Sequence, residues 1–528
     1  MLSVLNTQID QTQTMSITLI IFWFIMTAFW AVRIEDRTLR FNHPGLIVLG
    51  AVLSGVILYV TTPALVLVNV LFYLALSLAA SGVAASFLYD SEKMRVVGGT
   101  VLTLAILCIP MLTAGAQVIG AQSLADIPQV RTVDNTTELI DTDHIQLASA
   151  KTALWRADKV IGNLGYKVGV FTPDVQFIED ELVWLVPMDY TSLDKALIYA
   201  GEGTDGYVVV SSEDPKAEPG RVTGLQMRYT PHAILEYDLN RHIWEDYPTY
   251  VLHKPIFQLN DEGNPRWVTL LSRPALYGVI GETPEGVVVT DPVTGANEFF
   301  DLGKQPAWIQ RVYDEDLTET YLDWWGTYSD GWINSWWGQR DLKYPSGEVY
   351  VEHGEAGATL SSGEPDVYLV QGTDGNQYWF TAITTPGKDS SMVGYVLCDV
   401  QDGTFTFYNA PGYYNDYGAA ANVQQHQKVA MATGLEVVQP IMYVIDGHEV
   451  WIIPVISQTG EVMEIGLVVA HGGETFVGTS LDDVLSQWRG TAVETPNPDD
   501  DEVTVQEIEE IRELLDRLEA RLKAQNRT

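Results

Sequence analysis

The sequence predicts three parts: an N-terminal four-helix transmembrane bundle, an α+β extracytoplasmic domain of about four tandem αβββ units, and a short C-terminal coiled-coil helix. Four apolar stretches near the N-terminus predict the bundle, because about 20 apolar residues in a helix cross a bilayer. Four successive copies of a tryptophan strand followed by a glycine and valine strand predict the repeat. A short heptad near the C-terminus predicts the coiled coil.

The apolar stretches cover residues 16–32, 45–61, 64–88 and 96–119. Basic residues lie between the first and second stretches and between the third and fourth: Arg33, Arg37, Arg40, Lys93 and Arg95. By the positive-inside rule these loops are cytoplasmic. We therefore expect an integral membrane protein, in contact with the lipid bilayer, whose N-terminus and large C-terminal domain are extracytoplasmic. Since no stretch contains a charged residue or histidine, we expect it to anchor rather than transport.

The formal net charge of −39 belongs entirely to residues 121–528, because acidic and basic residues balance in residues 1–120. Such an acidic domain argues against nucleic acid as a partner, since nucleic-acid binding requires a basic surface. The two cysteines, Cys108 and Cys398, fall in different predicted parts and are not expected to pair. A large exported domain without disulfides fits a bacterial, archaeal or viral envelope.

The repeat is carried by tryptophans on apolar strands and by glycines that open valine-rich strands: Trp184 with Gly206, Trp267 with Gly286, Trp379 with Gly394, and Trp451 with Gly466. We interpret the tryptophans as core residues, although a ligand surface is the alternative. The acidic residues of the preceding turns, Asp180, Asp261, Asp374 and Asp446, are interpreted as hairpin residues, because they lack the spacing of a calcium loop.

Helical patterns precede the four copies at residues 141–163, 230–244, 317–325 and 418–433, and glycine turns follow the third strands at 292–295, 401–403 and 471–473. Three antiparallel strands covered by one helix form a stable two-layer unit. The predicted boundaries are 1–120 for the anchor, 121–228, 229–312, 313–412 and 413–490 for the four units, 491–502 for an acidic linker, and 503–528 for the coiled-coil helix.

The αβββ pattern with the turn sequence DPVTG resembles PepSY-like domains, which are small exported modules associated with peptidase inhibition or envelope regulation. The segments RHIWEDY, DEGNPRW, GVVVTDPVTG and GTYSDGWINS are similar to an uncharacterised family of membrane-anchored bacterial and phage envelope proteins. This resemblance covers about residues 145–488. It implies a fold and an envelope location but transfers no catalytic residue.

The coiled-coil prediction depends on an alternating spacing of three and four residues, shared by Ile508, Ile511, Leu515, Leu518 and Leu522. These residues form an a/d seam, and we expect them to contribute to a homo-oligomer. The seam covers little more than two heptads, so it needs the rest of the assembly for stability.

An aromatic-rich insertion in the third unit contains Trp324, Trp325, Trp332, Trp336 and Trp337. One helix or strand cannot bury so many indoles, so we expect part of this segment to be an exposed binding surface. A buried seam between the second and third units is the alternative reading.

The sequence contains no GxSxG, HExxH or CxxC motif and no phosphate-binding glycine loop, and its histidines are dispersed. We therefore expect no enzymatic activity, no cofactor and no metal site. The leading hypothesis is a membrane-anchored envelope protein that forms a homo-oligomeric structural or interaction assembly. The alternatives are a receptor module that binds a saccharide or an envelope protein through exposed aromatics, and a PepSY-like regulator of an envelope peptidase.

Overall fold

The computed structural model describes residues 59, 62–67, 69–70, 100, 103, 114–134, 139–162, 168–199, 201–276, 280–346, 367–385 and 391–490, and the backbone of 32–35 and 38–41. The last two ranges are strands β1 (Val32–Glu35) and β2 (Thr38–Phe41), which pair as an antiparallel hairpin. By its internal contacts the chain divides into two compact parts, Met1–Val477 and Gly478–Thr528.

Among the described residues, no helix has the length and apolar composition needed to cross a membrane. This finding overturns the predicted four-helix transmembrane bundle and the integral-membrane localisation. Most of the predicted spans 16–32, 45–61, 64–88 and 96–119 lie outside the described residues. An apolar segment is expected to be buried, but its composition does not show whether lipid or protein buries it. Residues 62–66 are buried or half-buried against protein: the Trp244 indole donates to the Pro63 carbonyl at 2.8 Å, and the Leu65 amide donates to the Pro248 carbonyl at 2.7 Å.

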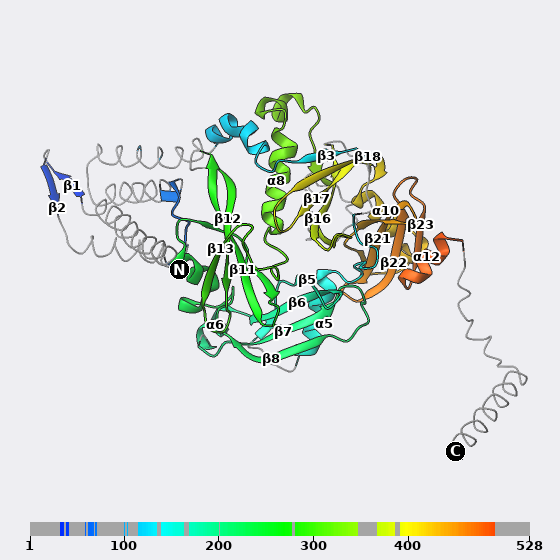
Figure 1. Ribbon diagram of the computed structural model, residues 1–528, viewed down its shortest axis with the longest axis horizontal. Coiled ribbons are helices and arrows are strands. Elements are labelled where there is room, and N and C mark those ends of the chain that lie inside the picture. The colour runs from blue at the N-terminus through cyan, green and yellow to red at the C-terminus, as the bar shows by residue number, and fades with distance from the viewer. Residues whose placement is uncertain are drawn as a thin grey trace, which may run out of the picture. The chain divides into compact units, whose positions relative to one another are not determined.

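The rest of the described chain is rich in β structure and contains four further sheets (Figure 1). The first consists of β4 (Val168–Val170), β5 (Asp174–Ile178), β6 (Glu181–Tyr190), β7 (Thr204–Ser211) and β8 (Gly220–Met227). The second consists of β9 (Val251–Leu252), β10 (Ile256–Leu259), β11 (Pro265–Leu276), β12 (Ile280–Thr290) and β13 (Asn297–Asp301). The third consists of β3 (Arg131–Val133), β14 (Tyr344–Pro345), β15 (Tyr368–Gln371), β16 (Gln377–Thr384), β17 (Ser391–Asp399) and β18 (Phe405–Tyr414). The fourth consists of β19 (Leu435–Val437), β20 (Ile441–Ile445), β21 (His448–Ser457), β22 (Val462–Val469) and β23 (Thr475–Gly478).

All four sheets share one strand order. A long strand that carries the repeated tryptophan pairs on one side with two short strands in succession and on the other side with the glycine strand. The glycine strand then pairs with a final strand, and β3 adds to the third sheet in parallel with β18. The first of the two short strands in each sheet, such as β4 or β19, was not predicted from the sequence.

Residues 114–125 are helical. Further along the chain the structure contains the helices α5 (Ala150–Ile161), α6 (Leu193–Tyr199), α7 (Leu239–Asp246), α8 (Glu315–Tyr328), α10 (Asp416–Gln425), α11 (Gln427–Ala430) and α12 (Leu481–Trp488), a 3₁₀ turn at Leu235–Tyr237 and a π-helical turn at Asn334–Gly338. Side chains of Ser149, Asp238, Asp314 and Asn415 accept a backbone N–H at the start of α5, α7, α8 and α10. These N-caps satisfy amides that have no partner within the helix.

One hydrogen bond recurs in every sheet and links the tryptophan strand to the segment before the helix. The four indole Nε1 atoms donate to backbone carbonyls: Trp184 to Ala148 at 2.8 Å, and Trp267 to Tyr229, Trp379 to Tyr313 and Trp451 to Tyr414 at 3.0 Å each. In the first, third and fourth cases the accepting residue immediately precedes the N-cap. In these three sheets the tryptophan is therefore bonded to the residue next to the start of the helix.

The same segment is bonded to the end of the glycine strand. The amides of Ala148, Tyr229, Tyr313 and Tyr414 donate to the carbonyls of Ser212, Pro292, Val400 and Ala470, at 2.9 or 3.0 Å. Each accepting residue lies two positions after the one that faces the tryptophan across the strands. The four sheets thus repeat both their strands and these specific contacts.

A glycine and tyrosine contact recurs in three of the four sheets. Gly295, Gly403 and Gly473 have φ values of +76°, +71° and +77° and lie in the turn after the glycine strand. A Cβ on them would lie 2.4, 2.2 and 2.7 Å from the rings of Tyr229, Tyr313 and Tyr414 respectively. Glycine is required there both for its backbone conformation and for space. The first sheet has Ala148 at the tyrosine position and a longer turn.

Side chains rather than a continuous ladder join the first and second sheets. Asp174 and Gln176 on β5 accept hydrogen bonds from the Phe257 and Leu259 amides of β10, both at 2.8 Å, and Gln176 donates to the Leu259 carbonyl at 2.9 Å. Gln310 binds the amide and carbonyl of Phe177 in the same way, at 2.8 and 2.7 Å. A shared apolar core includes residues of the first, second and third sheets and of α8.

The second part of the chain is described only over residues 478–490, where the Ser480 hydroxyl caps α12 by accepting the Asp483 amide at 3.2 Å. The predicted acidic linker and coiled-coil helix, with Ile508, Ile511, Leu515, Leu518 and Leu522, lie outside the described residues.

Candidate functional site

The structure separates the five tryptophans of the aromatic-rich insertion into two groups. Trp324 and Trp325 belong to α8 and pack, half-buried, against the shared core. Trp336 and Trp337 lie on the π-helical turn and are 65% and 80% exposed, and Trp332 just before it is half-buried. With Ile333, which is 70% exposed, they form what we call the tryptophan segment, residues 331–339.

Local hydrogen bonds hold the tryptophan segment in shape. Gly331, at φ +81°, ends the turn that follows α8. The Asn334 side chain donates to the Arg340 carbonyl at 2.8 Å and accepts the Arg340 amide at 3.2 Å, which closes the turn. The ring centroids of Trp332 and Trp336 are 5.7 Å apart, and those of Trp336 and Trp337 are 5.2 Å apart with an angle of 43° between the planes. The exposed indoles are therefore contiguous but not coplanar.

A first cavity of about 650 Å³ lies between the first and second sheets, and Thr62, Ala64 and Asn69 contribute to its wall. His232, another residue of the wall, binds a buried carboxylate. The buried Asp189 carboxylate accepts the His232 amide and contacts ring Nδ1, both at 2.9 Å, and it also accepts the Thr230 hydroxyl at 2.6 Å. The hydrogen bond to Asp189 raises the pKa of His232, and Phe171 packs on the ring at 4.4 Å. This pair could not be predicted from the sequence, because the two residues are 43 positions apart.

His253 lines the same cavity and forms a buried ionic cluster. Its Nε2 lies 2.7 Å from the Ser272 hydroxyl and 3.1 Å from Glu282, and its Nδ1 lies 3.4 Å from Asp314, the N-cap of α8. Burial by itself lowers the pKa of His253, but the two carboxylates outweigh burial and raise it to about 9. Burial likewise opposes the ionised form of Asp314, yet His253 lowers the pKa of that carboxyl below its usual value. The cluster ties the second sheet to α8.

A second cavity of about 460 Å³ is lined by residues of α5, β5, β10, β15 and β16 and of the start of α8. Trp184 and Trp379 form part of its apolar wall, and Arg311, Asp174 and Asp314 are among its buried polar side chains. Arg311 forms an ion pair with Asp174 and lies over the Trp379 ring, 5.5 Å from its centroid.

The repeated tryptophans lie in the cores of their sheets, and three of them also border a cavity. Trp451, Trp267 and Trp379 are 0%, 3% and 7% exposed, as core residues are, and Trp184 is half-buried. Trp267 also borders the first cavity, and Trp184 and Trp379 border the second.

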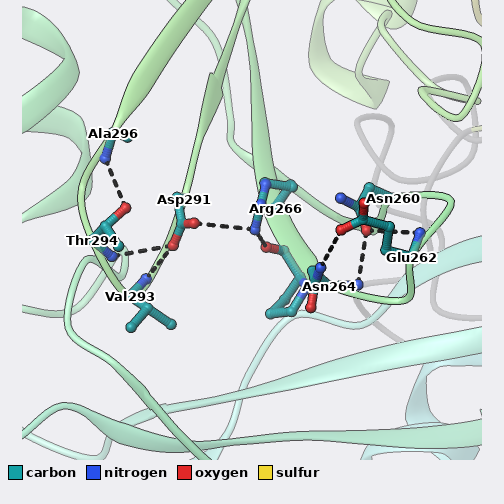
Figure 2. A network of polar contacts seen from close by, with 9 residues as sticks. Asn260, Glu262, Asn264, Arg266, Asp291, Val293, Thr294 and Ala296 are labelled. Carbon is teal, nitrogen blue, oxygen red and sulfur yellow. Dashed lines mark hydrogen bonds and ion pairs between the residues drawn. The ribbon is translucent and has the colours of Figure 1, made fainter.

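Asp180, Asp261, Asp374 and Asp446 all lie in turns. Polar side chains hold several of the turns together. Figure 2 shows two such turns of the second sheet: the Asp291 carboxylate accepts the Val293 and Thr294 amides and forms a 3.3 Å ion pair with Arg266, and Asn260 accepts the Glu262 and Asn264 amides. Asp374 similarly accepts the Asn376 amide at 3.0 Å. Across the described residues, no group of three or more His, Cys, Asp or Glu side chains is placed to hold a metal ion.

Comparison with known proteins finds no matching family model, no matching curated protein and no matching solved structure. The similarity to PepSY-like domains and to membrane-anchored envelope proteins therefore stays a prediction from the sequence.

Proposed function

We propose that this chain is a non-enzymatic interaction protein that assembles with copies of itself through the tryptophan segment. The observation that carries the proposal is the exposure of Ile333, Trp336 and Trp337, at 70%, 65% and 80%, on one ordered turn. Exposed tryptophan is costly in water, and tryptophan is the residue type most enriched at the energetic centres of protein interfaces.

Charge favours a second copy as the occupant of this surface. A net charge of −39 makes copies of the chain repel each other over most of their surface. Residues 331–339 contain no charged side chain, so two copies can meet there with little repulsion and with the largest gain from apolar burial. A twofold contact between identical patches would satisfy both conditions.

The geometry of the exposed indole rings favours a protein partner over a saccharide. Sugar rings stack on flat aromatic platforms, whereas Trp336 and Trp337 are inclined by 43° and stand beside the aliphatic Ile333. An irregular apolar surface is better matched by the side chains of a protein.

Sedimentation velocity of the full chain tests the proposal. We expect the wild-type protein to associate as its concentration rises, and more strongly as NaCl screens the charge. The double variant Trp336→Ser, Trp337→Ser should raise the dissociation constant at least about tenfold, because each such anchor residue is worth about 2 kcal/mol.

A matched control removes other exposed apolar side chains. Leu193 and Leu197 on α6 are 75% and 62% exposed, and their replacement by Ser should leave association unchanged. A wild-type protein that stays monomeric at all concentrations, or equal losses in both double variants, would contradict the proposal. The predicted heptad is tested separately by Ile508→Asp with Leu515→Asp, which shows whether the C-terminal residues contribute an independent contact.

A further inference from the structure

The second cavity has the construction of a ligand site. Its volume of about 460 Å³ falls within the usual range for small-molecule pockets and is far larger than one or two ordered waters require. Two of the repeated indoles, Trp184 and Trp379, supply apolar wall, together with Leu154 and Leu369. Polar side chains in the wall are buried: Arg311 is 6% exposed and Asp314 is 4% exposed.

Two carboxylates in this wall, Asp174 and Asp314, already contact other groups of the protein. Asp174 pairs with Arg311 through one oxygen and accepts the Phe257 amide at 2.8 Å through the other. Asp314 accepts the Leu317 amide at 2.8 Å through one oxygen, and its other oxygen lies 3.4 Å from His253. Burial raises the pKa of the remaining carboxyl, Glu315.

One donor in the wall has no partner. The Nε of Arg311 is fully buried and makes no hydrogen bond within the described residues, although a buried N–H of a charged group is strongly favoured to find an acceptor. Lys254, an exposed lysine in the lining, adds a second positive charge. The lining of the cavity therefore places two cationic side chains, Arg311 and Lys254, beside an apolar wall.

We propose that the second cavity binds a small organic acid, whose carboxylate pairs with Arg311 and Lys254 and whose aliphatic or aromatic body packs against Trp184 and Trp379. Charge-assisted hydrogen bonds to guanidinium are stronger than neutral ones and select carboxylates over uncharged analogues. The inference does not depend on self-assembly, since the cavity and the tryptophan segment share no residue.

Calorimetric titration of the full chain with benzoate, hexanoate and indole-3-acetate, and with the corresponding amides, tests this directly. We expect at least one acid to bind and its amide to bind at least about tenfold more weakly. Lys254→Gln should weaken the acid severalfold, whereas Lys216→Gln, which removes an exposed lysine outside the cavity, should not.

A cavity-filling variant locates the site. Leu154→Trp, on the half-buried face of α5, should abolish binding of the acid while circular dichroism shows a folded protein. If the variant does not fold, two comparisons still test the proposal: the acid against its amide, and Lys254→Gln against Lys216→Gln. No heat with any acid, equal binding of acid and amide, or unchanged binding in a folded Leu154→Trp protein would overturn the proposal.

Discussion

At the scale of single residues, the repeated glycine and tyrosine contact shows why a turn glycine is needed. Gly295 and Gly263 both have positive φ, +76° and +75°, in turns of the same sheet. Only Gly295 has a ring against it, and the Tyr229 ring is itself held between His242, with centroids 4.5 Å apart, and Tyr237, at 5.5 Å. The ring cannot move aside without disturbing these neighbours.

We predict that Gly263→Ala lowers the free energy of unfolding by about 1 kcal/mol, the cost of the left-handed backbone alone. Gly295→Ala should cost about 1–3 kcal/mol more, because its Cβ also displaces a packed ring. Urea unfolding of both variants measures the difference. In a Tyr229→Ala background that difference should vanish, and equal losses for the two glycines in the wild-type background would show that the ring contact is unimportant.

At the scale of elements, the indole hydrogen bond connects a strand to the start of a helix. Trp451 is fully buried and Trp184 half-buried, yet both make the same bond to a carbonyl before an N-cap. Water can replace a lost donor at a cavity wall but not in a closed core.

We predict that Trp451→Phe lowers the free energy of unfolding by about 2–4 kcal/mol, since it leaves a cavity and an unsatisfied Tyr414 carbonyl. Trp184→Phe should cost only about 1 kcal/mol, because the half-buried Trp184 borders the second cavity and its shortening removes less packing. Chemical denaturation of both variants checks the ranking. A larger loss at Trp184 would show that burial does not govern the value of this bond.

Part of this element structure could be predicted from the sequence. The tryptophans lie on strands of their predicted type, and α8 and α10 lie close to the predicted helical segments at 317–325 and 418–433. The repeated glycines lie within their strands rather than opening them: Gly286, for example, is seven residues into β12. Alternation identifies a strand but does not give its ends, because strand pairing extends through polar residues such as Glu282.

The sites were less predictable than the strands. The density of indoles indicated an exposed surface, but only the break between α8 and the π-helical turn decides that Trp336 and Trp337 face solvent while Trp324 and Trp325 pack inward. The cavities were missed entirely. Asp174 and Arg311 are 137 residues apart, and local periodicity carries no information about such pairs.

At the scale of the whole molecule, the buried His253 cluster is an ionic link between the second sheet and α8. The groups that face its ring are Ser272 and Glu282 of the second sheet and Asp314 at the start of α8. The pKa of His253 is raised from 6.5 to about 9 in the folded protein. A raised pKa means that the folded state holds the proton more tightly than the unfolded state does.

We predict that this contribution to stability is complete below pH 6.5 and is lost as the pH rises to about 9. It is on the order of 3 kcal/mol. Thermal unfolding of the wild-type protein between pH 6 and pH 10 should show the loss, and His253→Gln should remove that part of the pH dependence and lower stability at pH 6. The same slope in both proteins would assign the pH dependence to other groups.

The side-chain bridges between β5 and β10 have a consequence for the behaviour of the chain in concentrated solution. An unpaired strand edge is a template on which another polypeptide can add and start a fibril. Here side chains bond the backbone groups at these edges. Asp174 bonds the Phe257 amide, Gln176 bonds Leu259, and Gln310 bonds Phe177. Replacing Gln176 by a residue that cannot form these bonds would leave the Leu259 amide and carbonyl on the edge of β10 without partners and open a route to amyloid-like aggregation.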